Sequence, residues 1–167
     1  MKKLPVMKEY LKRRSDVFSD DMKDLIRLFQ KHAVAYCIVG GFAVNYYGYI
    51  RTTQDIDFLI FPSKSNAEKV MHALRDFGFA KAGIPKEFFE TAGSAVHLGV
   101  EPNRIDLLTH LIGISNETIF SNFQQVELDN IAVNIISYDD LILAKKSSKR
   151  LRDQADAEEL EMNRKKG

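Results

Sequence analysis

The sequence predicts a mixed α/β (α+β) fold, in which helices pack on a mixed β-sheet and the chain ends in helix. Short β-prone apolar runs and segments of helical periodicity follow one another without strict alternation, which favours a mixed sheet. The 167 residues contain no internal repeat and no low-complexity linker, and they are enough to bury one core. We therefore expect a single domain over residues 19–167, preceded by a basic tail or loosely attached helix over residues 1–18.

The first predicted elements are a capped helix, a buried strand and a short helix. Ser19 is a suitable N-cap for a helix whose apolar residues recur at i, i+3, i+4 and i+7, namely Met22, Leu25, Ile26 and Phe29. Residues 36–39 form a short β-prone run bounded by Gly40-Gly41, which predicts a buried strand. Residues 42–47 have the pattern of a helix that ends near Gly48.

The middle of the chain predicts a strand followed by a helix. Residues 55–61 are β-prone, and Pro62 ends this predicted strand. Residues 65–68, Ser-Asn-Ala-Glu, have the form of a capping box and predict the start of a helix that ends at Gly78. The apolar face of that helix consists of Ala67, Val70, Met71 and Leu74.

The second half of the chain predicts two hairpins and a helical ending. Residues 94–100 and 104–108 are predicted as paired strands, and so are residues 126–128 and 131–136. Residues 138 to about 162 have helical character and form one helix or two.

Composition and charge favour a folded domain that does not bind nucleic acid through its overall charge. The contents of 45% hydrophobic and 28% charged residues are typical of a folded domain. Lys and Arg number 24 against 23 Asp and Glu, which argues against binding nucleic acid through overall charge alone. The single cysteine, Cys37, lies in an apolar run and is expected to be a buried packing residue. No segment approaches the roughly 20 apolar residues that span a bilayer, and no apolar stretch follows the charged N-terminus, so we expect no membrane association and a cytoplasmic setting.

Two neighbouring carboxylates are the first candidates for chemistry. Asp55 and Asp57 are two apart in a predicted strand, so their side chains share one face while Ile56 and Phe58 point into the core. Like charges side by side repel unless a cation lies between them. Magnesium meets this need, because it takes oxygen ligands and is commonly held by one or two carboxylates together with substrate phosphates.

A third carboxylate repeats the pattern. Asp106 lies among apolar residues at the centre of the predicted strand 104–108, where an acid requires a partner. A metal shared with Asp55 and Asp57 is one such partner, and a local ion pair is the alternative for any of the three taken alone.

The Gly40-Gly41 pair lies where a buried strand gives way to a helix. A helix start offers unpaired N–H groups to phosphate, and glycine allows a close approach of the backbone. Such turns also occur for geometric reasons alone.

These motifs together resemble the nucleotidyltransferase superfamily with a polymerase-beta-type palm. The resemblance rests on Val39-Gly40-Gly41, on Arg51-Thr52-Thr53-Gln54-Asp55-Ile56-Asp57 and on Ile105-Asp106-Leu107. The form is similar to the branch that holds AbiEii-type toxins and small antibiotic-modifying nucleotidyltransferases. The ending is also similar, with a helical Lys145 followed by Arg150-Leu151-Arg152-Asp153-Gln154-Ala155-Asp156. Arg152 stands where that motif has lysine, and Gly41 stands where many members have serine.

The resemblance implies a palm fold and a set of site residues. Asp55, Asp57 and Asp106 would be catalytic and would bind two Mg²⁺ ions, with Mn²⁺ as an alternative. By this resemblance Asp106 would serve the catalytic ion and orient or deprotonate the acceptor hydroxyl. The implied nucleotide-binding residues are Gly40, Gly41, Arg51 and Lys145.

Other interpretations of several side chains stay open at this point. Lys145 is equally well read as a solvated helix lysine, and Arg51 as a residue that steadies the Asp-x-Asp strand. Asp153 and Asp156 are expected to pair with the arginines at 150 and 152. The four histidines, His97 among them, show no metal-binding spacing and are assigned to packing or surface.

Two functions therefore compete. The first is a metal-dependent nucleotidyltransferase that takes an NTP, ATP foremost, and passes NMP to an acceptor that is RNA, protein or a small molecule. The second is a non-catalytic nucleotide- or protein-binding palm of a toxin–antitoxin-like pair, with a cognate partner protein. The presence of all three acids favours the enzyme.

Overall fold

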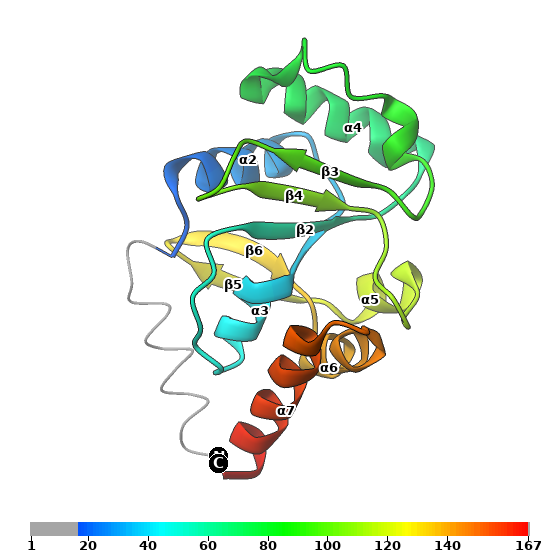
Figure 1. The fold of residues 1–167 in the computed structure, drawn as a ribbon. Helices are drawn as coiled ribbons and strands as arrows, with labels where there is room; N and C mark the ends of the chain where they lie inside the picture. Colours follow the sequence, from blue (N-terminus) through cyan, green and yellow to red (C-terminus); the bar gives the residue numbers. More distant parts are fainter. Residues whose placement is uncertain (1–16, 167) are drawn as a thin grey trace.

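The computed structural model describes residues 17–166, so most of the predicted tail, residues 1–16, lies outside the described residues. The described chain forms one six-stranded sheet with helices around it (Figure 1). The strands are β1 (Tyr36–Val39), β2 (Ile56–Ile60), β3 (Ala95–Leu98), β4 (Ile105–Leu108), β5 (Gln124–Leu128) and β6 (Ile131–Ile135). The α-helices are α2 (Asp20–Lys31), α3 (Gly40–Tyr46), α4 (Lys64–Leu74), α5 (Asn116–Asn122), α6 (Tyr138–Ser147) and α7 (Leu151–Lys166). Two further short helical segments are η1 (Arg75–Phe79), a π-helix, and η2 (Lys86–Phe89), a 3₁₀-helix.

The sheet is mixed, as the sequence predicts, with the strand order β3-β4-β2-β1-β6-β5. The hairpins β3–β4 and β5–β6 are antiparallel and occupy the two edges. In the centre, β2 runs parallel to β4 and antiparallel to β1. The parallel pairing sets Asp57 opposite Asp106, so two of the candidate carboxylates lie side by side on neighbouring strands.

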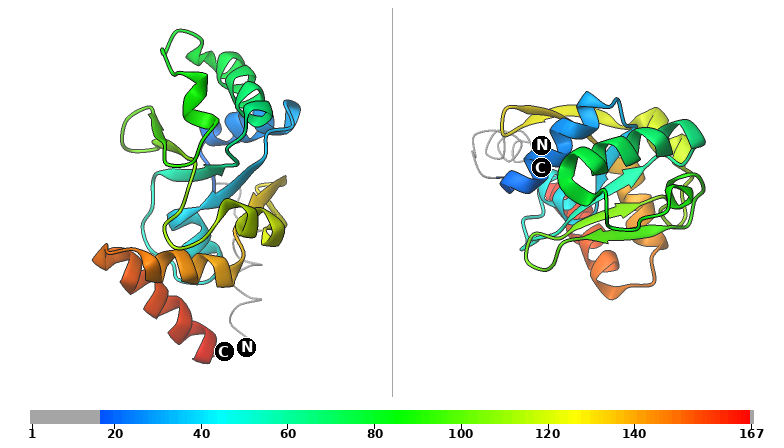
Figure 2. Two further views of the ribbon diagram at one scale, coloured as in Figure 1. Left: turned by 90° about the vertical axis from the view of Figure 1, so that its right-hand side faces the viewer. Right: turned by 90° about the horizontal axis from the view of Figure 1, so that it is seen from above.

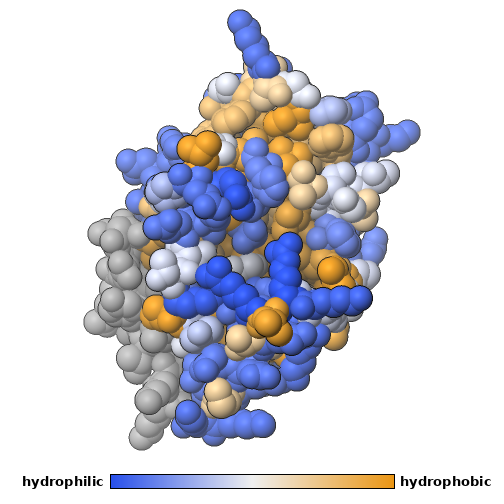
Figure 3. All heavy atoms as spheres, in the orientation of Figure 1, coloured by the Kyte–Doolittle hydropathy of each residue, from blue (hydrophilic) through white to orange (hydrophobic). Residues whose placement is uncertain are grey.

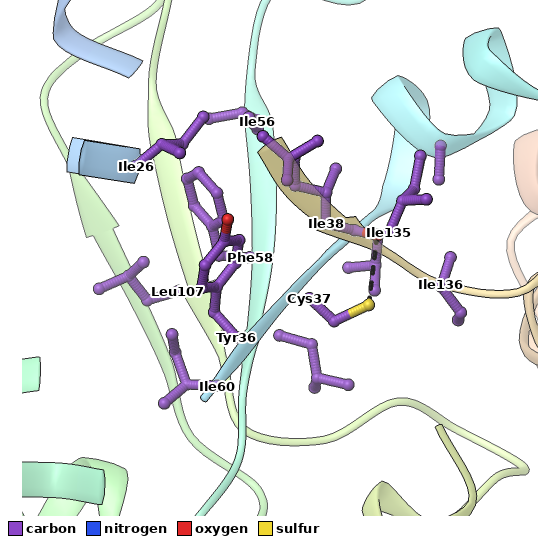
Figure 4. Close-up of a cluster of buried hydrophobic side chains, with 14 of the residues drawn as sticks. Ile26, Tyr36, Cys37, Ile38, Ile56, Phe58, Ile60, Leu107, Ile135 and Ile136 are labelled. Carbon is purple, nitrogen blue, oxygen red and sulfur yellow. Dashed lines mark hydrogen bonds between the residues drawn. The ribbon is translucent and has the colours of Figure 1, made fainter. Parts of the chain in front are cut away.

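Helices cover the sheet at opposite ends of the molecule. The helix α4 lies at one end next to α2, and α6 and α7 lie at the other end, with the strands between them (Figures 1 and 2). Buried apolar side chains fill the space around the central strands, with Tyr36, Ile38, Phe58 and Leu107 near the middle (Figure 4). Cys37 is fully buried in this core, as expected.

Local sequence signals explain where most helices begin. The Ser19 hydroxyl accepts a hydrogen bond from the N–H of Met22 at 3.3 Å, and the four predicted apolar positions of α2 are all buried. The expected cap of α4 at Ser65 is wrong. Ser63 caps that helix instead, by accepting from the N–H of Asn66 at 3.0 Å. The predicted series of elements omits α5 and η2, which are short and lack a clear apolar period.

Val17 and Phe18, which the predicted boundary places in the tail, contact the rest of the described chain. Phe18 is buried and stacks on Phe42, with 5.7 Å between ring centroids. The backbone N–H groups of Val17 and Phe18 donate to the carboxylate of Asp129 at 3.2 and 2.8 Å. Among residues 17–166, no helix combines the length and the apolar character needed to cross a membrane.

Candidate active site

A cavity of about 660 Å³ brings together all the residues proposed from the sequence for chemistry. Its walls come from the ends of β2 and β4, the start of α3, the segment before β2 and the helices α6 and α7. The lining includes the three acids Asp55, Asp57 and Asp106 and the four proposed nucleotide ligands Gly40, Gly41, Arg51 and Lys145. The face drawn in Figure 3 carries hydrophilic side chains between the strands and α6–α7, with isolated apolar residues among them.

Strand periodicity directs the carboxylates into this cavity. Ile56 and Phe58 are fully buried on the core face of β2, so Asp57 between them points to the other face. Burial raises the pKa of the Asp57 carboxyl to about 6, and the negative charges of Asp106 and Asp55 add to the shift against the opposing charges of Lys145 and Arg104. Among the described residues, no side chain makes a hydrogen bond or ion pair with Asp57.

Gly40 lies against Asp57 and has no space for a side chain. A Cβ atom at position 40 would lie 2.1 Å from Oδ2 of Asp57, and the φ of Gly40 is +66°. A Cβ at Gly41 would lie 2.6 Å from the hydroxyl of Thr53. The glycine pair is therefore required by the packing of the turn against β2 and the preceding loop, and it leaves backbone on the cavity wall.

Asp106 is held by two residues that the sequence analysis leaves out of the site. The Nε and Nη2 groups of Arg104 donate to the two carboxylate oxygens of Asp106 at 2.8 and 3.0 Å. His97, directly opposite on β3, places Nδ1 2.7 Å from Oδ1 of Asp106. His97 is exposed, in agreement with its assignment to packing or surface, but its ring also contacts Asp106. Position supplies a signal for Arg104, because residues two apart in a strand share a face, but His97 can be found only once the β3–β4 register is known.

Arg104 also contacts Asp55. Its backbone N–H donates to Oδ1 of Asp55 at 3.0 Å, and its Nη2 lies 3.7 Å from Oδ2. The neighbouring carboxylates, Asp106 foremost, raise the pKa of the Arg104 guanidinium, so it stays charged. One arginine therefore bridges two of the three acids.

A second charged network joins the C-terminal helices to the cavity wall. The ammonium group of Lys145 lies 2.7 Å from Asp153 and 2.9 Å from Asp156. The guanidinium of Arg51 donates to both oxygens of Asp156, at 2.7 and 2.9 Å. Asp156 is almost completely buried, with 1% of its surface exposed. Ser148 donates to the other oxygen of Asp153 at 2.6 Å.

This network corrects two expectations. Asp153 and Asp156 pair with Lys145 and Arg51, and not with Arg150 or Arg152 as expected. Lys145 is buried and is therefore no solvated helix lysine.

The chemistry of the acids suits a divalent ion of the magnesium type. Asp55, Asp57 and Asp106 offer hard oxygen donors on one cavity wall, and no cationic side chain in the described part of the chain is paired with Asp57. Within residues 17–166, however, no three His, Cys, Asp or Glu side chains already stand in an arrangement that would hold a metal ion. In this arrangement Arg104 and His97 contact Asp106. The donor set fits a divalent ion, provided that Asp106 exchanges these contacts for the ion.

Residues 18–166 match the family described as "Nucleotidyl transferase of unknown function (DUF2204)", and the chain belongs to this family. The match confirms the resemblance drawn from the motifs and assigns the transfer of a nucleotidyl group to the protein.

Two further comparisons add little to this assignment. No curated protein matches the chain. Among solved structures, the lincomycin-bound lincosamide antibiotic adenylyltransferase LnuA is similar at 15% sequence identity and a TM-score of 0.49, with 86% of this chain and 97% of that chain covered.

Proposed function

We propose that this nucleotidyltransferase moves NMP from an NTP, ATP foremost, to an acceptor hydroxyl and releases pyrophosphate, with divalent metal held by Asp55, Asp57 and Asp106. One observation carries the proposal. The register of β2 with β4 sets Asp57 beside Asp106 on the wall of a cavity of about 660 Å³, and no cation among residues 17–166 forms an ion pair with the Asp57 carboxylate. Two such acids are costly to keep together unless a cation neutralises them.

Each acid has a role that follows from its position. Bound Mg²⁺ or Mn²⁺ would neutralise charge on the phosphates and on the attacking and leaving oxygens. Asp57, whose oxygens make no hydrogen bond or ion pair with another residue of 17–166, and Asp55, at the entry to β2, would hold it. Asp106 orients the acceptor hydroxyl and accepts its proton, because it lies on the adjacent strand at the same depth as Asp57.

The remaining proposed residues act on the triphosphate. Gly40 and Gly41 bring backbone N–H groups to the cavity wall, and no side chain caps the start of α3. Arg51 and Lys145 are fixed in place by Asp156, and an ammonium group with two carboxylate partners keeps one N–H for phosphate. These two cations would therefore orient the triphosphate without moving far.

The acceptor approaches along the wall that continues from Asp106. The residues after Asp106 on this wall include Leu108, His110 and Ile112, and α6 contributes Leu141 and Ala144 opposite. This half of the cavity is mainly apolar and lies beside the proposed base. It is where an RNA, protein or small-molecule acceptor would present its hydroxyl.

The test separates nucleotide binding from chemistry. We expect wild-type protein with Mg²⁺ and α-labelled NTPs to label one of a panel of RNA, protein and small hydroxyl acceptors. Asp106→Ala should keep near-native NTP affinity, while its single-turnover rate falls by orders of magnitude, because Asp106 serves the acceptor and not the nucleotide. Asp139→Ala, at an exposed position of α6, is the control and should keep both values.

Two results would contradict the proposal. Equal, non-zero transfer rates for wild type and Asp106→Ala would remove Asp106 from the mechanism. No transfer by the wild type with any NTP, divalent ion or acceptor would favour a palm that binds nucleotide or protein without turnover.

A further inference from the structure

Arg104 occupies the hydrogen-bonding positions of the carboxylates that the proposed function assigns to metal. Its Nε and Nη2 donate to both oxygens of Asp106, and the backbone and side chain together engage both oxygens of Asp55. The outer face of the guanidinium is held by Glu101, with Nη1 3.1 Å from Oε1. Arg104 thus contacts three acids, which are Asp55, Asp106 and Glu101. Of the three proposed metal ligands, it contacts Asp55 and Asp106 but not Asp57.

A guanidinium and a divalent ion cannot use the same carboxylate lone pairs at once. The paired N–H groups of an arginine match the two oxygens of a carboxylate, and such bidentate contacts are the strong ones among protein hydrogen bonds. Each carboxylate oxygen has a second lone pair, but a divalent ion on Asp106 would lie beside the positive charge of the guanidinium, so the two cations compete for this carboxylate. The side chain of Arg104 is 30% exposed and lines the open cavity, so it has space to move away.

We propose that Arg104 is an internal competitor for metal, which holds Asp106 and Asp55 in place through its guanidinium and gives them up when a divalent ion binds. This inference rests on the proposed function, since it concerns the same three acids. It assigns Arg104 a positioning role. The arginine keeps two like-charged side chains together, and its contacts and positive charge lower the affinity of these carboxylates for a metal ion.

A charge-conserving substitution isolates the competition. Lysine is a point charge that cannot make the bidentate contact, so Arg104→Lys keeps the net charge of the cavity but weakens the competitor. We expect Arg104→Lys to bind Mn²⁺ about fivefold more tightly than wild type, measured by the loss of free-ion EPR signal in the absence of nucleotide. Arg150→Lys is the matched control. Arg150 lines the same cavity and makes no ion pair with a described residue, so its Mn²⁺ affinity should equal that of wild type.

A second measurement uses the wild-type protein and does not depend on a variant's stability. The Nε–H resonance of Arg104, identified by its loss in Arg104→Lys, should shift on titration with Mg²⁺. The resonance of Arg51 should not shift, because its contacts with Asp156 lie outside the acidic cluster.

The outcomes distinguish this inference from the proposed function. Saturable Mn²⁺ binding that is equal in wild type and Arg104→Lys, or weaker in the variant, overturns the competition and leaves the metal site standing. An Arg104 resonance unchanged at saturating Mg²⁺ does the same. No divalent-ion binding by any of the three proteins, even with an NTP analogue present, overturns both.

Discussion

At the scale of single residues, the main feature of the site is that no cationic side chain among residues 17–166 forms an ion pair with the carboxylate of Asp57. Its carboxylate lies between Ile56 and Phe58, which are fully buried, and beside Asp106 on the next strand. Arginine is bound to Asp55 and Asp106 but not to Asp57. The carboxyl group of Asp57 therefore has a raised pKa, and groups with shifted pKa values are common at functional sites.

The raised pKa of Asp57 predicts how stability depends on pH. The carboxyl titrates near 3.8 in the unfolded chain and near 6 in the folded protein. Ionised Asp57 therefore destabilises the folded state, and this cost is absent below pH 3.8, grows between the two values and is complete above pH 6. We expect Asp57→Asn to raise the free energy of unfolding by roughly 3 kcal/mol above pH 6, since one pKa unit corresponds to about 1.4 kcal/mol.

Denaturant unfolding at several pH values, with EDTA present, checks this expectation. The gain should shrink as the pH falls toward 4, and the exposed Asp24→Asn should show no such trend. A gain independent of pH would mean that the amide packs better, with no role for charge. The variant should also lose transfer activity despite its added stability.

At the scale of elements, α7 is anchored to the cavity by one buried acid. Asp156 joins Arg51, from the segment before β2, to Lys145 on α6. Apart from that contact, the side chains that α7 buries include only Ala157 and Leu160 among apolar ones. The helix thus depends on charge pairing as well as on apolar packing.

Removal of the Asp156 charge should accordingly loosen α7 and disorder the two cations. We expect Asp156→Asn to lower the free energy of unfolding by roughly 3 kcal/mol, because it leaves Arg51 and Lys145 incompletely paired in a buried setting. NTP affinity should fall as well. Asp139→Asn, which removes an exposed ion pair with Arg164, should leave the unfolding curve unchanged. An Asp156→Asn variant as stable as wild type would show that α7 is held without the charge of Asp156.

Sequence periodicity predicts the strands and the long helices well but not their partners. The alternation in 55–61 and 104–108 places the acids on strands, since apolar residues at every second position fix the core face. The order of strands in the sheet depends on which edges meet across long loops, and neither Asp57 opposite Asp106 nor His97 opposite Asp106 follows from local pattern. The pairing of Asp156 with Arg51 spans 105 positions, so local sequence favours the nearby arginines as its partners instead.

Short elements with few apolar residues are also not predicted from the sequence. The helix α5 buries only Asn116 and Ile119, so its seven residues show no helical period. Its start is set by Ser115, whose hydroxyl accepts from the N–H of Thr118 at 3.2 Å. The position of Gly40 between a strand and a helix predicts a place in the site, but its contact with Asp57 follows only from the three-dimensional structure.

At the scale of the whole molecule, the cavity predicts that metal and nucleotide bind together. Three carboxylates leave much of an octahedral shell to be completed by phosphate oxygens and water, and two of the three are already engaged by Arg104. We expect weak Mg²⁺ binding alone and much tighter binding when an NTP is present. Calorimetry with and without an NTP analogue measures the coupling. Tight Mg²⁺ binding by the protein alone, or NTP binding insensitive to EDTA, would count against the site as described.

The parallel pairing of β2 with β4 also determines when this site appears during folding. A parallel connection cannot close through a tight turn, so the chain has to pass through α4, η2 and β3 before Asp106 reaches Asp57. Contacts between residues so far apart in sequence form slowly and late, because the intervening loop must first be ordered. A partly folded chain in which β2 and β4 are not yet paired therefore keeps Asp106 away from Asp57, and the proposed site is assembled only when these two strands pair.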